Sequence, residues 1–225
     1  MIPWETLDSV TAPGGGKMVL VRRGDEYVIR VDGQDLMGSR QHGSEEALAT
    51  QGCAGLASVA GARVLVGGLG MGFTTRAALD ALGRDATVEV AELVPDVVRW
   101  NRGPLAHLAG HPLDDPRVHV VEGDVSDVIA RAEARYDAIL LDVDNGPDAL
   151  TSPTNARLYG RAGLERAARA LRPKGVLGVW SARDADRFTT RLERAGFTTR
   201  VERVLARHGG KKRHTLWFAT PVARR

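Results

Sequence analysis

The sequence contains a single cysteine, Cys53, among its 225 residues. One thiol excludes an internal disulfide and any metal site built from several cysteines. No stretch approaches the run of about twenty apolar residues that crosses a membrane, and residues 1–5 (MIPWE) show neither the basic nor the apolar region of an export signal. We therefore expect a cytoplasmic protein that spans no membrane.

Strong charge of either sign is also missing. The net charge is +3, and hydrophobic residues make up 43% of the chain, as in an ordinary globular domain of this length. The one dense basic cluster is residues 207–214 (RHGGKKRH). No aromatic residues interleave it to stack nucleic-acid bases, so the cluster favours an exposed hairpin tip over a nucleic-acid surface.

A glycine-rich turn is the most informative feature that is present. It follows the apolar stretch 64–67, and Gly68, Gly70 and Gly72 allow a sharp turn and a close approach of main chain to a ligand. About twenty residues later, Glu92 ends a second apolar stretch, where it can accept hydrogen bonds from ribose hydroxyls. The pattern predicts a pocket for a nucleoside-containing ligand; the alternative is a structural turn beside an unrelated surface glutamate.

Apolar stretches alternate with helical patterns from about residue 63 onward. Because these stretches are continuous rather than alternating, we expect strands buried on both faces, hence a parallel sheet covered by helices in a doubly wound α/β fold. The expected strands are 64–67, 87–92, 117–121, 136–141 and 175–180, and the expected helices are 74–82, one from 95, 124–134, 162–171 and 185–195.

The last part of the chain predicts two successive strands, 198–206 and 214–219, joined by the basic loop. Strands joined by a short loop are antiparallel. A parallel sheet that ends in such a hairpin is typical of the methyltransferase variant of the Rossmann-like sheet. This topology favours a ligand of the S-adenosylmethionine type over a dinucleotide.

The first residues predict a separate small unit. Stretches 18–21 and 27–31 alternate around a polar turn and indicate a β-hairpin. A helix is then expected from Ser44, as its cap, to about residue 59. We therefore divide the chain into a small N-terminal β unit, residues 1–42, and an α/β domain, residues 43–225.

Acidic residues follow two further strands. Asp124 and the main chain of Val125 suit the exocyclic amine and a ring nitrogen of adenine, although Asp124 also fits a simple helix cap. Residues 142–148 (DVDNGPD) include Asp142, Asp144 and Asn145. The carboxylates of this segment can attract an amine or act as a general base. The same residue types favour a plain turn. They lie in one loop without a matching histidine, so we expect no metal.

Two histidines are left out of the predicted site. His42 and His214 each stand alone near a turn, where a histidine is more often a surface residue than a catalytic base. Trp180, at the end of the strand 175–180, is assigned to core packing.

Taken in order, these features resemble the spermidine synthase family (polyamine aminopropyltransferases). The similarity covers roughly residues 18–181 and includes the N-terminal hairpin, the SEE helix start at 44–46, the glycine turn, Glu92, EGD at 122–124, YDAILLD at 136–142, LY at 158–159 and LRPKGVL at 171–177. The resemblance implies a methyltransferase-like fold and transfer of an aminopropyl group from decarboxylated S-adenosylmethionine to a diamine. It also implies a homodimer.

The chain departs from the family's pattern at three places. Met71 stands where the family's glycine turn has an aspartate that holds the donor amine, and Asn145 stands at the second aspartate of the family's Asp-x-x-Asp-Pro loop, with Asp144 one position away. Residues 41–46 (QHGSEE) lack the tyrosine that helps to hold the polyamine. Transfer of a methyl group would need fewer of these side chains.

The prediction is thus a transferase that binds S-adenosylmethionine or its decarboxylated form and delivers a methyl or aminopropyl group to a small acceptor, with an amine as the first candidate. The catalytic candidates are Asp144, Asp142 and Asn145. The cofactor-binding candidates are Gly68, Gly70, Met71, Gly72, Glu92, Asp124, Val125 and Asp142. Two alternatives stay open: a catalytically silent nucleoside-binding or scaffold homologue, and a nucleic-acid methyltransferase.

Overall fold

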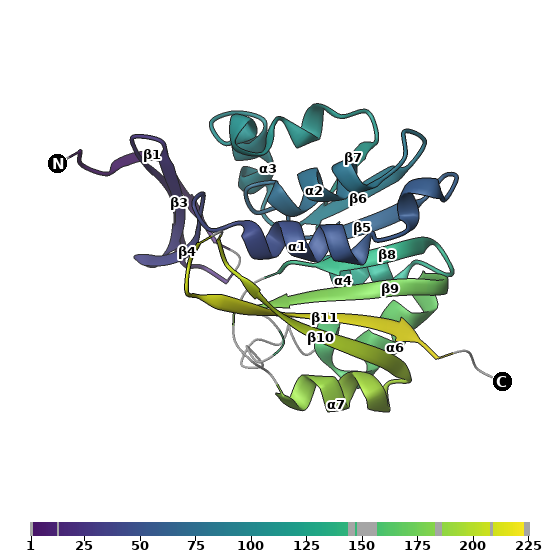
Figure 1. Ribbon diagram of the computed structural model, residues 1–225. Helices are drawn as coiled ribbons and strands as arrows, with labels where there is room; N and C mark the ends of the chain where they lie inside the picture. The colour runs from purple at the N-terminus through teal and green to yellow at the C-terminus, as the bar shows by residue number, and fades with distance from the viewer. Residues whose placement is uncertain are drawn as a thin grey trace.

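A seven-stranded sheet lies at the centre of the protein in the computed structural model (Figure 1). The structure describes residues 2–12, 14–143, 147, 157–182, 186–207 and 209–222. Five strands are parallel and two are antiparallel, as the doubly wound α/β prediction requires. In spatial order the strands are β10 (Phe197–Leu205), β11 (Arg213–Pro221), β9 (Leu171–Ser181), β8 (Tyr136–Leu141), β5 (Arg63–Gly67), β6 (Thr87–Glu92) and β7 (Val118–Glu122).

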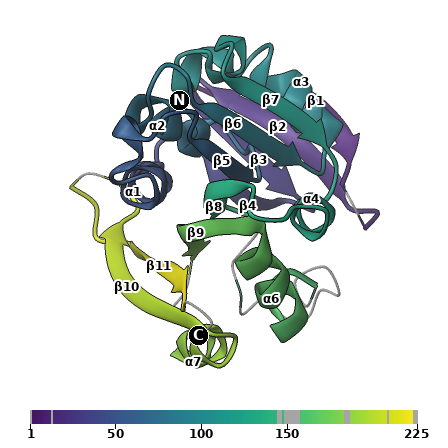
Figure 2. The same ribbon diagram turned by 90° about the vertical axis from the view of Figure 1, so that its right-hand side faces the viewer.

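Helices cover both faces of this sheet (Figure 2). On one face Val64, Val66 and Leu140 pack under one set of helices, and on the other Leu65 and Ile139 pack under a second set. Successive residues of a strand point to opposite faces, so continuous apolar strands supply two cores. The first set is α1 (Gly43–Gly52), α2 (Phe73–Ala81) and α3 (Pro95–Asn101), and the second is α4 (Val125–Ala130), α6 (Arg161–Ala170) and α7 (Asp186–Arg194).

The predicted C-terminal hairpin is confirmed. Strand β10 pairs antiparallel with β11, and β11 pairs antiparallel with the end of β9. Because β11 runs opposite to β9, its first residues lie at the carboxyl edge of the parallel strands, where Thr215 pairs with Ser181. The hairpin therefore brings His214 to the same edge as the glycine turn.

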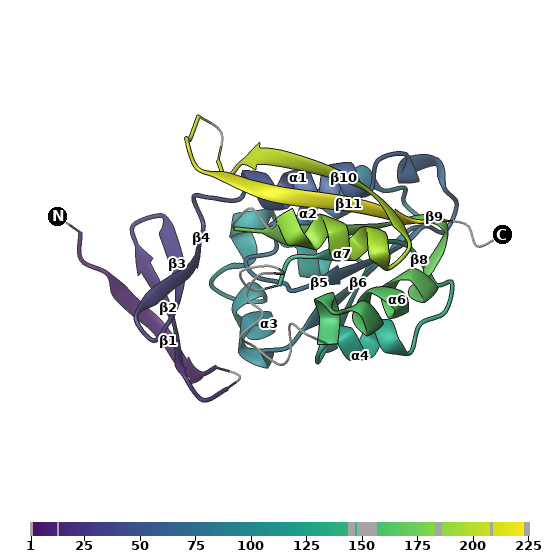
Figure 3. The ribbon, with the colours of Figure 1, turned by 90° about the horizontal axis from the view of Figure 1, so that it is seen from below.

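A second, four-stranded antiparallel sheet contains the predicted N-terminal hairpin (Figure 3). Its outer strands were not predicted, because most of their residues are exposed or half-buried and give no apolar alternation. Trp100 Nε1 donates a 2.7 Å hydrogen bond to Asp8, which joins this sheet to α3. The strands are β1 (Glu5–Thr11), β2 (Lys17–Arg23), β3 (Glu26–Val31) and β4 (Gln34–Gly38).

Two helices are shorter than predicted. Helix α1 ends at Gly52 instead of about residue 59, and Gly55 then adopts φ +83°, which a right-handed helix does not allow. A short 3-10 turn, Leu56–Ser58, follows. Helix α4 ends at Ala130 instead of residue 134, and Ala134 has φ +42°. Within the described residues, no helix is long and apolar enough to cross a membrane.

Candidate functional site

The glycine turn joins the ends of three neighbouring parallel strands. The N–H of Gly68 donates to the carbonyl of Ala91 near the end of β6, and the N–H of Asp142 donates to the carbonyl of Gly67 at the end of β5, each at 2.9 Å. Gly68 has φ +87°, and a Cβ on it would overlap the carbonyl oxygen of Asp142. Glycine is therefore required here both for the conformation and for the close approach of two main chains.

Glu92 is buried beside this turn, with 7% of its surface exposed. Its Oε2 accepts a hydrogen bond from the N–H of Leu69, and its Oε1 accepts one from the N–H of Val94, both at 2.8 Å. Glu92 is thus not an unrelated surface acid. Acceptance of hydrogen bonds from a sugar diol by this carboxylate stays a prediction.

Asp124 lies at the end of β7 and caps α4. Its Oδ1 accepts from the N–H of Ser126 at 2.8 Å and from the hydroxyl of Ser126 at 2.6 Å. Its Oδ2 lies 3.6 Å from Nη1 of Arg157. Val125, the next residue, packs its side chain against Gly67. The cap is therefore present, and the role of these residues toward adenine stays a prediction.

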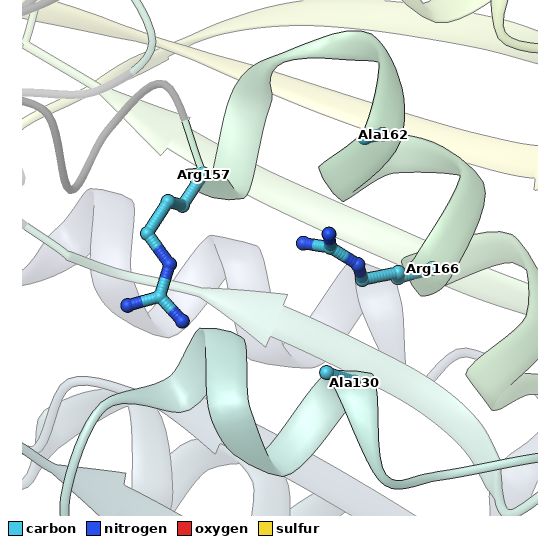
Figure 4. Close-up of a pocket in the computed structure, with 4 residues that line it drawn as sticks. All are labelled: Ala130, Arg157, Ala162 and Arg166. Atoms are coloured by element: carbon cyan, nitrogen blue, oxygen red, sulfur yellow. The ribbon is translucent and has the colours of Figure 1, made fainter.

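Arg157 also reaches a cavity of about 480 Å³ between α4 and α6 (Figure 4). The guanidinium groups of Arg157 and Arg166 both point into this space, which Ala130 and Ala162 also line. Arg157 makes a 2.6 Å ion pair with Asp127 as well. None of these described lining residues carries a carboxylate or belongs to the glycine turn.

A much smaller cavity lies against the glycine turn. Its volume is about 10 Å³, roughly the room that one water molecule occupies. The side chain of Met37, from β4, comes within 2.8 Å of the position that a Cβ of Gly70 would take, so the small sheet covers the turn. The cavity is lined by Met37, Gly38, Gln41, Glu45, Leu69, Gly70, Met71, Phe73, Thr74 and Asp142.

Two carboxylates from different elements face this small cavity. Asp142 follows β8, and its Oδ2 accepts a 2.6 Å hydrogen bond from the hydroxyl of Thr74. Glu45 comes from the first turn of α1. Burial, and after it the nearby charge of Asp142, raises the pKa of Glu45 to about 8. Burial also raises the pKa of Asp142, against the opposing effect of the Thr74 hydrogen bond.

Sequence reasoning missed Glu45 as a site residue. The pattern placed it only as a favourable acid at a helix start, and nothing local to the sequence showed that α1 begins over the carboxyl edge of the sheet. Met37 and Thr74 were missed for the same reason. Met71, which was predicted, is buried with 3% exposed and lines the same cavity.

Ser44 was expected to cap α1, but His42 occupies the cap position and makes no side-chain cap bond. The buried hydroxyl of Ser44 instead lies 2.5 Å from Oε2 of Glu45 and 2.8 Å from Nδ1 of His214. Nε1 of Trp180 donates to it at 3.0 Å. His214 is therefore not a surface residue: 4% of it is exposed.

Asp144 and Asn145, the other predicted catalytic residues, lie outside the described residues. Among the residues that the structure does describe, no group of three or more histidine, cysteine or acidic side chains could hold a metal ion. The candidate site consists of the glycine turn, Glu92, Asp124 and the cavity that holds Glu45 and Asp142.

Comparisons with known proteins show the family of the chain. Residues 46–183 match the family described as Spermine/spermidine synthase domain. The polyamine aminopropyltransferases of two Mycobacterium tuberculosis strains, CDC 1551 / Oshkosh and H37Rv, are each 35% identical over 167 residues, which is 72% of this chain and 30% of theirs. The chain thus spans less than a third of the length of these relatives.

Solved structures share the fold. A spermidine synthase in complex with the transition-state analogue AdoDATO superposes with a TM-score of 0.76 at 19% identity, over 95% of this chain and 73% of that one. The spermidine synthase from Thermotoga maritima gives a TM-score of 0.75 at 20% identity, over 95% of this chain and 72% of that one.

Proposed function

Because the chain belongs to the spermine/spermidine synthase domain family, we propose that it transfers an aminopropyl group from decarboxylated S-adenosylmethionine to a small amine. The observation that carries this proposal is the pair of carboxylates, Glu45 and Asp142, that lines the cavity beside the glycine turn. The names of the curated relatives support the same reaction type.

The donor's nucleoside fits the residues at the strand ends. Glu92 lies buried beside the glycine turn, where a carboxylate can accept from ribose hydroxyls, and the bare main chain around Gly68 and Gly70 lets a ligand approach closely. Asp124 would accept from the adenine amine through Oδ2, because Oδ1 is taken by Ser126. A cavity of about 10 Å³ holds no nucleoside, so Met37, a flexible side chain, must move when the donor binds.

The carboxylate pair also distinguishes between the two possible donors. S-adenosylmethionine carries a carboxylate on its tail, which ionised Glu45 and Asp142 would repel. The decarboxylated form carries only an ammonium group there, which the pair attracts. Asp142, together with Glu45 once it has released its proton, thereby provides negative charge near Met71, where the family has an aspartate, and this favours aminopropyl transfer over methyl transfer.

The chain's own residues mainly bind and orient the reactants. The sulfonium of the bound donor supplies the leaving group, so the protein needs to hold the acceptor nitrogen in line with the reacting carbon. Asp142 is fixed by Thr74 and by its main-chain bond to Gly67, and it can fix an ammonium group at the end of β8.

Calorimetric titration with decarboxylated S-adenosylmethionine, S-adenosylmethionine and 5′-methylthioadenosine tests the donor. We expect the decarboxylated form to bind at least tenfold more tightly than S-adenosylmethionine. Mass spectrometry after incubation with the decarboxylated donor and 1,4-diaminobutane should show an alkylated amine and the thioether. Tighter binding of S-adenosylmethionine, or silence from all three nucleosides, would refute the proposal.

A further inference from the structure

Glu45 and Asp142 line the small cavity from two different elements. Glu45 belongs to α1, and Asp142 follows β8. Gly43, the first residue of α1, donates its N–H to the carbonyl of Ala206 at 3.0 Å, so the C-terminal hairpin fixes the start of the helix. Glu45 is therefore presented to the cavity by a rigid element, as a functional carboxylate requires.

The hydroxyl of Ser44 has three polar neighbours, which determine where its single hydrogen points. Trp180 Nε1 can only donate, so it uses one lone pair of Ser44 Oγ. When Glu45 is ionised it can only accept, so Ser44 must donate its hydrogen to Oε2 of Glu45. His214 Nδ1 must then carry a hydrogen and donate to the second lone pair of Ser44.

His214 is suited to this role as a neutral donor. Burial, and after it the charge of Lys212, lowers its pKa to about 4. Its other nitrogen, Nε2, is buried and has no hydrogen-bond partner within the described part of the chain. In the neutral tautomer that carries its hydrogen on Nδ1, Nε2 has no hydrogen to donate. The lack of a partner at Nε2 therefore agrees with donation from Nδ1 to Ser44.

We propose that Glu45 is the general base that takes the proton from the acceptor's ammonium group, and that Ser44, held by Trp180 and His214, is a positioning residue for it. This inference rests on the proposed amine acceptor. Glu45 comes from α1 and does not belong to the glycine and acidic residues at the strand ends from which the site was predicted.

An ammonium group of the acceptor gives one proton to the carboxylate of Glu45, and its nitrogen lone pair becomes free. That lone pair forms a bond to the propyl carbon of the donor while the carbon–sulfur bond breaks. The sulfur leaves as a neutral thioether with the bonding electrons, and the new secondary ammonium group keeps the positive charge.

Burial, first, and then the polar and charged groups around Glu45 set its pKa. Asp142 faces it across the cavity, and Glu46 follows it on α1; both raise the pKa of Glu45, while the Ser44 hydrogen bond lowers it. His214 reaches it through Ser44, and Lys212 lies near His214. A base whose pKa lies near the working pH is well suited to proton transfer.

The test compares Glu45→Gln and Ser44→Ala with a matched control, Glu46→Gln. Glu46 is the next residue, but its carboxylate contacts Nδ1 of His42 at 2.8 Å rather than lining the cavity. Calorimetry with 1,4-diaminobutane, in the presence of 5′-methylthioadenosine and in buffers of different ionisation enthalpy, counts the protons released on binding. Glu45 must ionise to pair with the ammonium group of the diamine. At neutral pH, wild type and Glu46→Gln should therefore release about one proton more on binding than Glu45→Gln releases.

Steady-state kinetics provides the second measurement. Glu45→Gln should lower kcat by roughly a hundredfold or more, as expected for loss of a general base, and Glu45→Asp should recover part of it. Ser44→Ala should move the acidic limb of kcat/KM to higher pH, because the carboxylate loses the hydrogen bond that favours its charged form. A merely structural role for Ser44 would lower activity without moving that limb.

Equal proton release by wild type and Glu45→Gln would overturn the inference, as would an unmoved acidic limb in Ser44→Ala with its fold confirmed by circular dichroism. Failure of the proposed function is distinguishable, because it would appear as absent binding of the nucleosides. If 5′-methylthioadenosine binds but the diamine does not bind to wild type, the assignment of Glu45 is wrong while the donor assignment survives.

Discussion

The main-chain N–H of Leu69 donates a 2.8 Å hydrogen bond to Oε2 of Glu92, which joins the acid at the end of β6 to the glycine turn after β5. The same carboxylate that is expected to hold a ribose diol therefore also stabilises the turn that faces the ligand. Binding and stability are coupled at this residue, and its variants should show both effects.

Glu92→Ala should lower the free energy of unfolding by about 2–4 kcal/mol, because it leaves the N–H groups of Leu69 and Val94 without their acceptor in a buried place. It should also weaken binding of 5′-methylthioadenosine. Chemical denaturation and calorimetry measure the two effects. The control is Glu122→Gln, an exposed acid paired in register with Glu92 at the end of β7; an equal loss in this control would contradict the assignment.

Gly68→Ala should destabilise the protein by about 3 kcal/mol or more. The left-handed conformation of residue 68 is strained for alanine, and the added Cβ would overlap the carbonyl oxygen of Asp142. Gly55→Ala is the matched control. Gly55 has a similar φ of +83°, but nothing lies within 4 Å of its Cβ position, so its cost should stay near 1–2 kcal/mol, the approximate strain alone. Equal losses in thermal or urea unfolding would show that the approach of Asp142 does not matter.

Asp124→Asn separates the cap from the predicted adenine contact. The amide oxygen can replace Oδ1 toward Ser126, so the free energy of unfolding should change by less than about 0.5 kcal/mol, whereas Asp124→Ala should lose about 1 kcal/mol with the cap. The amide nitrogen would then stand at the position of Oδ2 and present a donor to the adenine amine. We expect at least tenfold weaker binding of 5′-methylthioadenosine to Asp124→Asn; unchanged affinity would leave Asp124 as a cap alone.

The raised pKa of Glu45 predicts a pH dependence of stability. The native state keeps the proton of Glu45 up to a pKa of about 8, well above the ordinary value of 4.5, so the native state binds more protons than the unfolded state between these values. The free energy of unfolding must therefore fall as pH rises through this window. Glu45→Gln should show a smaller fall than wild type.

The measurement is best made between pH 6.5 and about 8, by urea unfolding at several pH values. His214 acts in the opposite direction, because its lowered pKa makes stability rise with pH, but only between about 4 and 6.5. Glu46→Gln, the neighbouring control, should follow the wild-type slope. Parallel slopes for Glu45→Gln and wild type would show that Glu45 titrates normally.

The central sheet could be predicted from the chain because its signals are local. Strands β6 and β8 match the predicted stretches to the residue, since apolar runs buried on both faces end at the polar residues Glu92 and Asp142. The exposed strands β1 and β4 carry no such run and were missed. Helix α1 was predicted too long because apolar spacing continued past Gly52, whereas the backbone leaves the helix by Gly55.

The glycine turn and its acid follow from the order of residues along the chain alone, because in parallel βαβ units the ends of consecutive strands must meet at one edge of the sheet. The contact between Glu92 and Leu69 follows from that order. Only the tertiary structure placed Glu45 beside Asp142 and joined Ser44 to His214, residues separated by 170 positions. Such contacts depend on where a helix and an antiparallel hairpin pack across the sheet edge, and no periodicity within either segment records that position.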